Sequence, residues 1–203
     1  MLHATGAILI GGKSLRMGTD KALLRLDNRT ILERSVIKMQ AIFSEVIIVG
    51  GDKDKYHVLN ARTISDIHQD CGPLGGIHTA LLSATYDYVF ISACDMPFWG
   101  TGLARFLLES CVGHDGAVPA YNSYYEPLLA VYSKSCLPAI EDCLNQHQYK
   151  VSGFFANAKI NFVEKSLLEL VCKLDVDFYN INTIEDLNGS SIRHHLGSKP
   201  VPE

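Results

Sequence analysis

The sequence predicts an α/β protein whose mostly parallel sheet is covered by helices. Short apolar runs alternate with segments of helical periodicity through the first half of the chain, a pattern typical of βαβ units. Polar clusters at residues 11–21, at Asp66 and at Asp95 directly follow such runs. Because ligands of these sheets bind beyond the carboxyl ends of the strands, the three clusters are expected to converge in one crevice.

The strands expected in the first half are short apolar runs that end at glycine or polar residues. They cover residues 7–10, 46–49, 63–65 and 88–92. Helices are expected at residues 73–82, where a proline lies near the first turn, and at residues 101–111.

A further helix is predicted to begin after Thr30, which forms a capping box with Glu33. An apolar face follows at helical spacing. Its members are Leu32, Val36, Met39 and Phe43.

The alternation weakens after about residue 115, so the second half is expected to differ in character. Strands are predicted at residues 117–121 and 128–132, a helix from residue 134 or 135 to 145, and a last short strand at 178–182. We expect a single domain over residues 1–190. It divides into halves of about 1–112 and 113–190, and a tail follows at 191–203.

Composition limits the classes of protein to which the chain can belong. The 203 residues are 47% hydrophobic and 20% charged, which suits one sizeable core. A net charge of −4 without a basic block argues against nucleic acid as a partner. No apolar run is long enough for a membrane span, and the six cysteines show no C-x-x-C spacing. A cytoplasmic protein with reduced thiols and no membrane partner is expected.

The segment 7–24 permits two interpretations of how phosphate is bound. Gly12, Lys13 and Ser14 nearly complete a phosphate loop of the G-x-x-x-x-G-K-[ST] type, which would make the chain a hydrolase or kinase. That loop would have to unwind residues 8–10, which are bulky aliphatics suited to a strand interior.

The other interpretation leaves the strand intact up to Ile10. Gly11 and Gly12 then let the backbone approach a nucleotide, and a longer loop carries polar and basic side chains over the triphosphate. Those side chains are Ser14, Arg16 and Lys21. Arg binds phosphate oxygens in a bidentate fork, and Lys supplies a compact point charge. This interpretation favours a nucleotidyltransferase; a glycine-rich surface turn with solvated cations is the plainer alternative.

The motif L-x-G-G-x-S-x-R-M-G-x-D-K at residues 9–21 resembles the signature of the molybdenum cofactor guanylyltransferases of the MobA type. Further matches follow in order at residues 72–76, 94–97, 126–132 and 180–187, so the resemblance covers nearly the whole chain. Two positions depart from it. Ile10 stands where relatives usually have Ala, and Gly50 where they often have Asn. Both positions bear on the choice of base.

The resemblance implies a Rossmann-like, three-layer α/β/α fold of the nucleotide-diphospho-sugar transferase type. It also implies the substrates GTP and molybdopterin, the cofactor Mg²⁺, and transient contact with molybdopterin-handling proteins. The reaction would be attack by the terminal phosphate of molybdopterin on the α-phosphorus of GTP, with release of pyrophosphate. Positioning and charge stabilisation supply most of the catalysis in such transfers.

Asp95 is the expected magnesium ligand, because Mg²⁺ prefers carboxylate oxygens and shares them with substrate phosphates. Arg16 and Lys21 join it as catalytic residues that neutralise charge on the triphosphate. Asp66 is expected to accept hydrogen bonds from guanine or ribose. The nucleotide-binding set is Leu9, Ile10, Gly11, Gly12, Ser14, Lys21, Asp66 and Asp95. Asp95 as a helix cap and Asp66 as a solvated carboxylate are the structural alternatives.

The acceptor side of the cleft is expected to involve Glu126, Asn180 and Asn182, although the two asparagines suit a turn nearly as well. Tyr124 and Tyr125 suit either stacking on a pterin or packing at the rim. The sequence also permits three other functions. The chain could be a related transferase with another nucleotide or acceptor, such as a cytidylyl transfer to molybdopterin or a sugar phosphate. It could also be a phosphate-loop enzyme or a non-catalytic nucleotide-binding member of the family.

Overall fold

The computed structural model describes residues 1–11, 20–26, 28–51, 56, 61–121, 124–181 and 186. The strands of the main sheet within these ranges are β1 (Leu2–Leu9), β4 (Phe43–Val49), β5 (Arg62–Ile64), β6 (Tyr88–Ala93), β7 (Gly116–Tyr121), β8 (Tyr124–Tyr125), β9 (Leu129–Ser133) and β10 (Ile160–Glu164). A separate small hairpin pairs β2 (Arg25–Leu26) with β3 (Arg29–Thr30).

The helices lie between and after these strands. The α-helices are α1 (Ile31–Gln40), α3 (Gly72–Ser83), α4 (Thr101–Cys111), α5 (Leu137–Asn145), α6 (Lys165–Leu168) and α7 (Leu174–Asp177). Three 3₁₀ turns complete the described part: η2 (Lys21–Leu23), η4 (Lys134–Cys136) and η5 (Val151–Asn157).

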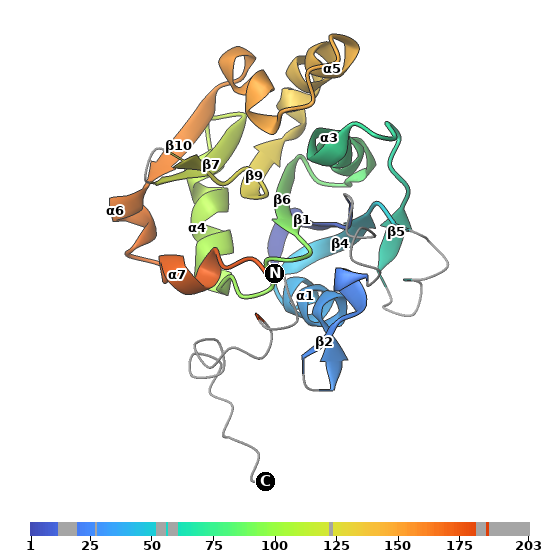
Figure 1. Ribbon diagram of the computed structural model, residues 1–203. Helices are drawn as coiled ribbons and strands as arrows, with labels where there is room; N and C mark the ends of the chain where they lie inside the picture. Colours follow the sequence, from blue (N-terminus) through green and yellow to red (C-terminus); the bar gives the residue numbers. More distant parts are fainter. Residues whose placement is uncertain are drawn as a thin grey trace, which may run out of the picture.

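The strands of the sheet follow the order β10-β7-β9-β6-β1-β4-β5, with β8 paired to β7 (Figure 1). β1 pairs in parallel with β4 and β6, β4 with β5, and β7 with β10. Only β8 and β9 run antiparallel to their neighbours in the described sheet. The mostly parallel sheet predicted from the sequence is therefore confirmed. The carboxyl ends of β1, β4, β5 and β6 share one edge.

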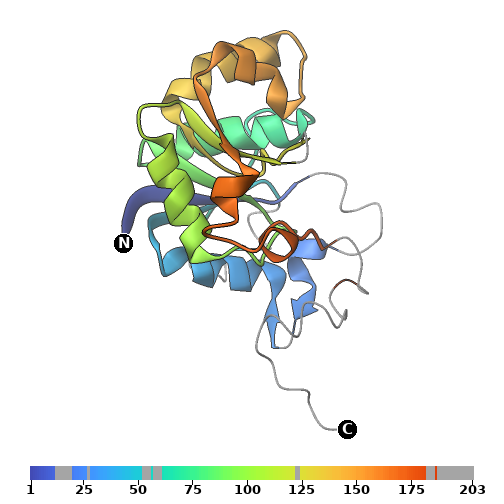
Figure 2. The ribbon, with the colours of Figure 1, turned by 90° about the vertical axis from the view of Figure 1, so that its left-hand side faces the viewer.

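Helices cover the two faces of the sheet, which gives three layers. In Figures 1 and 2, α3 and α5 lie on the upper side of the sheet and α1 on the lower side. The side chains of β6 alternate accordingly. Phe90 packs in the core that includes α1 and α4, whereas Val89 and Ile91 pack in the core that includes α3 and α5. All three are fully buried, so this strand is apolar on both faces, as a helix-covered parallel strand must be.

α1 begins where the sequence predicts a helix start. Thr30 Oγ1 accepts a hydrogen bond from the Glu33 amide at 3.1 Å, and the Glu33 carboxylate accepts one from the Thr30 amide at 2.6 Å. This confirms the capping box. The expected apolar face holds for the side chains of α1 but was wrong for Phe43, because the helix ends at Gln40 and Phe43 begins β4.

The prediction of a last strand at 178–182 was also wrong within the described residues. The chain forms the short helix α7 up to Asp177 and is irregular from Phe178 to Ile181. Asp177 stabilises this turn, because its carboxylate accepts hydrogen bonds from the Gly100 amide at 2.6 Å and the Lys173 amide at 3.0 Å. The edge strand of the second half is β10 instead.

None of the helices in the described part of the chain combines the length and apolar composition that a bilayer crossing needs.

Candidate active site

A cavity of about 750 Å³ lies at the carboxyl ends of β1, β4, β5 and β6, where the three polar clusters of the sequence were expected to meet. Six residues of the predicted nucleotide-binding set line it: Leu9, Ile10, Gly11, Lys21, Asp66 and Asp95. The other predicted members of this loop, Gly12, Ser14 and Arg16, lie outside the described residues. The structure thus brings together side chains that are up to 86 positions apart in the sequence.

Asp95 is presented by the turn that follows β6. The amide of its neighbour Cys94 donates to the Leu9 carbonyl at 3.1 Å, which extends the pairing of β6 with β1 by one step. From the other side, the Ile181 amide donates to the Asp95 carbonyl at 2.8 Å. Burial raises the pKa of the Asp95 carboxyl, and the nearby Lys21 ammonium opposes this rise. A positive ion or donor at this carboxylate would therefore relieve an existing desolvation penalty.

Lys21 faces Asp95 across the cavity. Its Nζ lies 3.9 Å from Asp95 Oδ2, and the side chains are 23% and 33% exposed, so the pair is loose and open to solvent. Asp20 forms the N-cap of η2 and thereby positions Lys21: its carboxylate accepts from the Ala22 amide at 3.0 Å and the Tyr56 hydroxyl at 2.5 Å. These contacts indicate that Asp20 positions Lys21.

Asp66 forms the wall of the cavity between β4 and α3. A Cβ built on Gly50 would lie 3.3 Å from Asp66 Oδ2, and one built on Gly76 would lie 3.8 Å from Oδ1. Burial raises the pKa of the Asp66 carboxyl, and Oδ1 is buried without a hydrogen-bond partner among the residues that the structure describes. An unsatisfied buried acceptor is costly, so this oxygen is suited to receive a donor from a ligand.

Gly50 is required by the backbone at the end of β4. Its φ is +86°, and a Cβ there would lie 1.9 Å from the Ile10 carbonyl oxygen. The two departures from the family pattern, Ile10 and Gly50, are therefore in direct contact. The contact involves the backbone of Ile10, whereas its side chain lies near Gly51, where a Cβ would be 3.4 Å from Ile10 Cγ2.

The amino terminus of α3 opens on the same cavity through Gly72 and Pro73. Helix amino termini attract anions because their first amide groups lack intrahelical partners. Gly75 lets this helix lie against the segment that follows Asp66, since a Cβ at this position would lie 2.8 Å from the His68 carbonyl oxygen.

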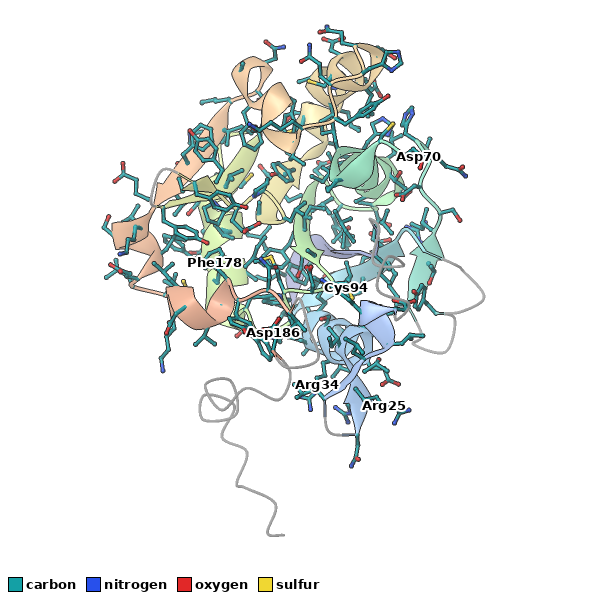
Figure 3. The ribbon with its side chains drawn as sticks, viewed as in Figure 1. Arg25, Arg34, Asp70, Cys94, Phe178 and Asp186 are labelled. Atoms are coloured by element: carbon teal, nitrogen blue, oxygen red, sulfur yellow. The ribbon has the colours of Figure 1, made fainter. Side chains whose placement is uncertain are left out.

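Several lining residues were missed by the sequence analysis, namely Gly51, His68, Gln69 and Asp70. Three of them could have been predicted from their position, because they lie in the loop that leads from Asp66 to α3. Figure 3 labels one of them, Asp70, beside α3, with Cys94 near the middle of the view.

The residues expected on the acceptor side lie in different environments. Glu126 is only 5% exposed, and burial raises its pKa to about 7, with a further contribution from the negative charge of Asp95. Asn180 is exposed and directly precedes Ile181, the residue that binds the Asp95 backbone. Asn180 is not in a strand, and Asn182 lies outside the described residues.

Comparison with known proteins identifies the family. Residues 6–159 match the MobA-like NTP transferase domain. The chain belongs to this family.

Relatives in several organisms extend the match over nearly the whole chain. A probable molybdenum cofactor guanylyltransferase of Pelotomaculum thermopropionicum is 42% identical over 187 residues, which is 92% of this chain and 91% of that protein. The molybdenum cofactor guanylyltransferase of Desulfosudis oleivorans is 36% identical over 185 residues, covering 90% and 92% of the two chains.

Solved structures confirm the fold. The crystal structure of molybdopterin-guanine dinucleotide biosynthesis protein A from Archaeoglobus fulgidus has a TM-score of 0.78 at 27% identity and covers 91% of this chain and 95% of its own. The 2-C-methyl-D-erythritol 4-phosphate cytidylyltransferase of Francisella tularensis, at 12% identity and a TM-score of 0.69 with 92% and 97% coverage, shares the fold.

Family membership agrees with the shape of β1 and decides against the phosphate-loop interpretation. β1 continues through Leu9, Ile8 is fully buried, and the Ile10 amide donates to the Val49 carbonyl at 2.8 Å. The residues that a phosphate loop would wrap around a phosphate are therefore committed to the sheet. Lys13 itself lies outside the described residues.

The donor set of the cavity is compatible with magnesium. No group of three or more His, Cys, Asp or Glu side chains suited to a metal occurs in the part of the chain that the structure describes. Mg²⁺ does not need one, because it retains waters and shares substrate phosphates while one or two carboxylates hold it. Asp95 supplies such a carboxylate at the rim of the cavity.

Proposed function

We propose that the chain transfers GMP from GTP to the terminal phosphate of molybdopterin and releases pyrophosphate, as a step in molybdenum cofactor biosynthesis. The observation that carries this proposal is the placement of Lys21 opposite Asp95, 3.9 Å apart, in a cavity that also holds the end of β1 and the amino terminus of α3. The printed names of the relatives supply the substrates. The six unpaired cysteines fit a cytoplasmic location.

The bond that forms joins an acceptor phosphate oxygen to the α-phosphorus of GTP, and the bond that breaks joins that phosphorus to the oxygen bridging to the β-phosphate. Lys21 would stabilise the charge on the triphosphate and on departing pyrophosphate, with Arg16 in the same role from the adjoining loop. Asp95 would hold Mg²⁺, which supplies charge neutralisation to the phosphates when bound.

The base and ribose would lie toward the end of β4. Asp66 is suited to accept hydrogen bonds from the N–H groups of guanine or from the ribose, because no described residue donates to its buried Oδ1. Leu9, Ile10 and Gly11 would form the floor beneath the nucleotide, together with Gly12 and Ser14 of the loop. Ile10 would contact the base from below, at the place where relatives have a smaller side chain.

The acceptor would approach from the second half of the chain. We place the nucleotide in the half formed by residues 1–112 and the acceptor in the half formed by about 113–190 of a single domain. Glu126, Asn180 and Asn182 would contact the acceptor or fix the boundary between the halves. Glu126 is suited to this boundary because its carboxyl and that of Asp95 influence each other electrostatically.

The test measures pyrophosphate release from GTP, Mg²⁺ and molybdopterin by wild type, Lys21→Ala and Asp95→Asn. Loss of one preorganised charged group should lower kcat by about 10²–10³. Lys150→Ala, which removes an exposed lysine remote in sequence from the cavity, is the matched control and should retain wild-type activity.

Nucleotide choice is tested by thermal unfolding with Mg²⁺ and either GTP or CTP. Greater stabilisation by CTP would replace GTP in the proposal by a cytidylyl donor. Loss of nucleotide binding in Lys13→Ala with full binding in Lys21→Ala would overturn the proposed site. Wild-type protein that releases no pyrophosphate would leave a non-catalytic nucleotide-binding role.

A further inference from the structure

A second cavity of about 780 Å³ opens between the β7–β8 hairpin and α6, outside the cavity described above. Tyr121, Tyr124 and Tyr125 line one side of it, and the end of β10 with α6 lines the other through Glu164 and Glu169. Nothing in the proposed transfer has yet used these residues.

Topology places this second cavity on the edge of the sheet that carries Asp95. β6 and β7 both run antiparallel to β9, and β10 runs parallel to β7, so β6, β7 and β10 end at one edge. Neighbouring strands lie about 4.8 Å apart, so the end of β7 lies roughly 10 Å from the end of β6 along this edge. A molecule that occupies the second cavity can therefore extend one end toward Asp95.

The aromatic side of the cavity is preformed and partly open. Tyr125 is stacked on Phe162 at 4.7 Å between ring centroids, and Tyr121 packs against Phe178 at 5.2 Å. Among the described rings, Tyr124 forms a T-shaped pair with Tyr121, at 6.2 Å and 69°, and stays 55% exposed. Its face is thus available to another planar ring, whereas the packed neighbours hold its surroundings in place.

Carboxylates outnumber ammonium groups in the described lining of both cavities, and the two cavities differ in the groups that could bind phosphate. The nucleotide cavity contains Lys21 and the amino terminus of α3, which suit a triphosphate. In the second cavity Glu164 and Glu169 face one lysine, Lys165, which is already paired with Glu169 at 3.5 Å. This lining, which has two carboxylates and no amino terminus of a long helix, favours a ligand that is rich in N–H donors.

Glu126 links the two cavities. Its negative charge raises the pKa of Tyr124, and burial together with this charge raises the pKa of Tyr121 to about 12. The same carboxyl interacts electrostatically with Asp95. Glu126 directly follows Tyr125, which lines the second cavity, and its carboxylate accepts a hydrogen bond at 3.3 Å from the amide of Leu128, which lines the nucleotide cavity.

We propose that the second cavity binds the pterin ring of the acceptor, with the ring stacked on Tyr124 and its amino and amide N–H groups donating to Glu164 and Glu169. This inference rests on the proposed function and assigns its acceptor a place. The terminal phosphate of the acceptor extends past Glu126 to the nucleotide cavity.

The experiment compares wild type, Tyr124→Ala, Tyr124→Phe and Glu164→Gln. Tyr86→Ala is the control, because Tyr86 precedes β6 at the opposite edge and meets only the edge of His3 among described rings, at 6.2 Å. Both the KM for each substrate and the direct binding of molybdopterin by calorimetry without GTP are measured.

Tyr124→Ala should raise the KM and the dissociation constant for molybdopterin about 10-fold or more, the effect of losing one aromatic stacking partner. Tyr124→Phe should behave as wild type, Glu164→Gln should weaken the same binding, and the KM for GTP should not change. Wild-type molybdopterin binding in both Tyr124→Ala and Glu164→Gln would overturn the inference.

Failure of the proposed function gives a different result. Wild-type protein would then bind molybdopterin without transferring GMP, and the calorimetric comparison of the Tyr124 variants would still decide the assignment of the cavity. Absence of any molybdopterin binding by wild type would overturn the assignment as well.

Discussion

Replacing Lys38 by Met tests how the turn that carries Asp95 is held. Lys38 lies on α1, and its ammonium donates hydrogen bonds to the carbonyls of Pro97 at 2.6 Å and Trp99 at 2.7 Å. The same ammonium lies 4.7 Å from the centre of the Trp99 ring. One buried charge thus joins the first helix to the segment directly after Asp95.

The change in the free energy of unfolding caused by Lys38→Met is the sum of opposing contributions. Desolvation lowers the pKa of Lys38 from 10.5 to about 8, against the favourable charge of Asp177, and this difference corresponds to about 3 kcal/mol. Met removes that penalty. It also leaves two carbonyls unpaired, at about 1–3 kcal/mol each, and loses a cation–π contact of about 0.5–2 kcal/mol. The losses exceed the gain, so Lys38→Met should lower the free energy of unfolding by about 2 kcal/mol at pH 7.

The pH dependence has a definite sign. Because the pKa of Lys38 is lower in the folded state, the unfolded chain binds more protons between about pH 8 and 10.5, and wild-type stability from this group rises with pH there. Met cannot titrate. The difference between wild type and Lys38→Met should therefore widen, by roughly 2 kcal/mol between pH 7 and 9.5.

Urea unfolding at both pH values measures these differences. Lys134→Met is the matched control, since it removes an ammonium–carbonyl bond of 2.7 Å, to Ala84, at the opposite edge of the sheet. Lys38→Met should also lower the rate of GMP transfer, whereas Lys134→Met should not. A stability difference that shrinks or stays constant as the pH rises would refute the reasoning.

Three further predictions concern the backbone, a buried carboxyl and a helix cap. Gly50→Ala should lose more stability and GTP affinity than Gly113→Ala, both measured by thermal unfolding with and without GTP. Both positions have positive φ, +86° and +77°, but only at Gly50 would a Cβ meet another atom, the Ile10 carbonyl oxygen at 1.9 Å. Burial raises the pKa of Glu126 from 4.5 to about 7, so the folded protein binds more protons than the unfolded chain between these pH values. The free energy of unfolding of the wild type should therefore fall by about 3 kcal/mol as the pH rises through this interval. Glu126→Gln should lack this pH-dependent fall when urea unfolding is measured across the same pH range. A variant with the same pH dependence as the wild type would show that Glu126 is not its cause. Thr30→Ala should lower the free energy of unfolding by about 1 kcal/mol in urea, through loss of the capping box.

The parts of the fold that were predictable have local causes. The bounds of α4 follow from periodicity alone, and the start of α1 follows from Thr30 and Glu33. The convergence of Lys21, Asp66 and Asp95 was predictable because parallel strands bring their carboxyl ends to one edge. The family resemblance was confirmed by the match over residues 6–159.

The parts that were missed depend on contacts between distant segments. Phe43 has the spacing of a helical residue, but the helix ends first and the side chain fills the core from β4. Residues 178–181 have strand-like composition, but Asp177 commits them to a turn by binding Gly100. The hydrogen bond from Tyr56 to Asp20 joins residues 36 positions apart, and no local sequence pattern predicts it.

The bond from the Ile181 amide to the Asp95 carbonyl has a consequence for the order in which the enzyme matures during translation. A nascent chain that has left the ribosome only through residue 112 can form β1, β4, β5 and β6, yet the turn bearing Asp95 still lacks this anchor. The anchor arrives only 86 residues after Asp95 itself has been made. Premature termination anywhere in that interval should release a protein whose Asp95 turn lacks the hydrogen bond from Ile181.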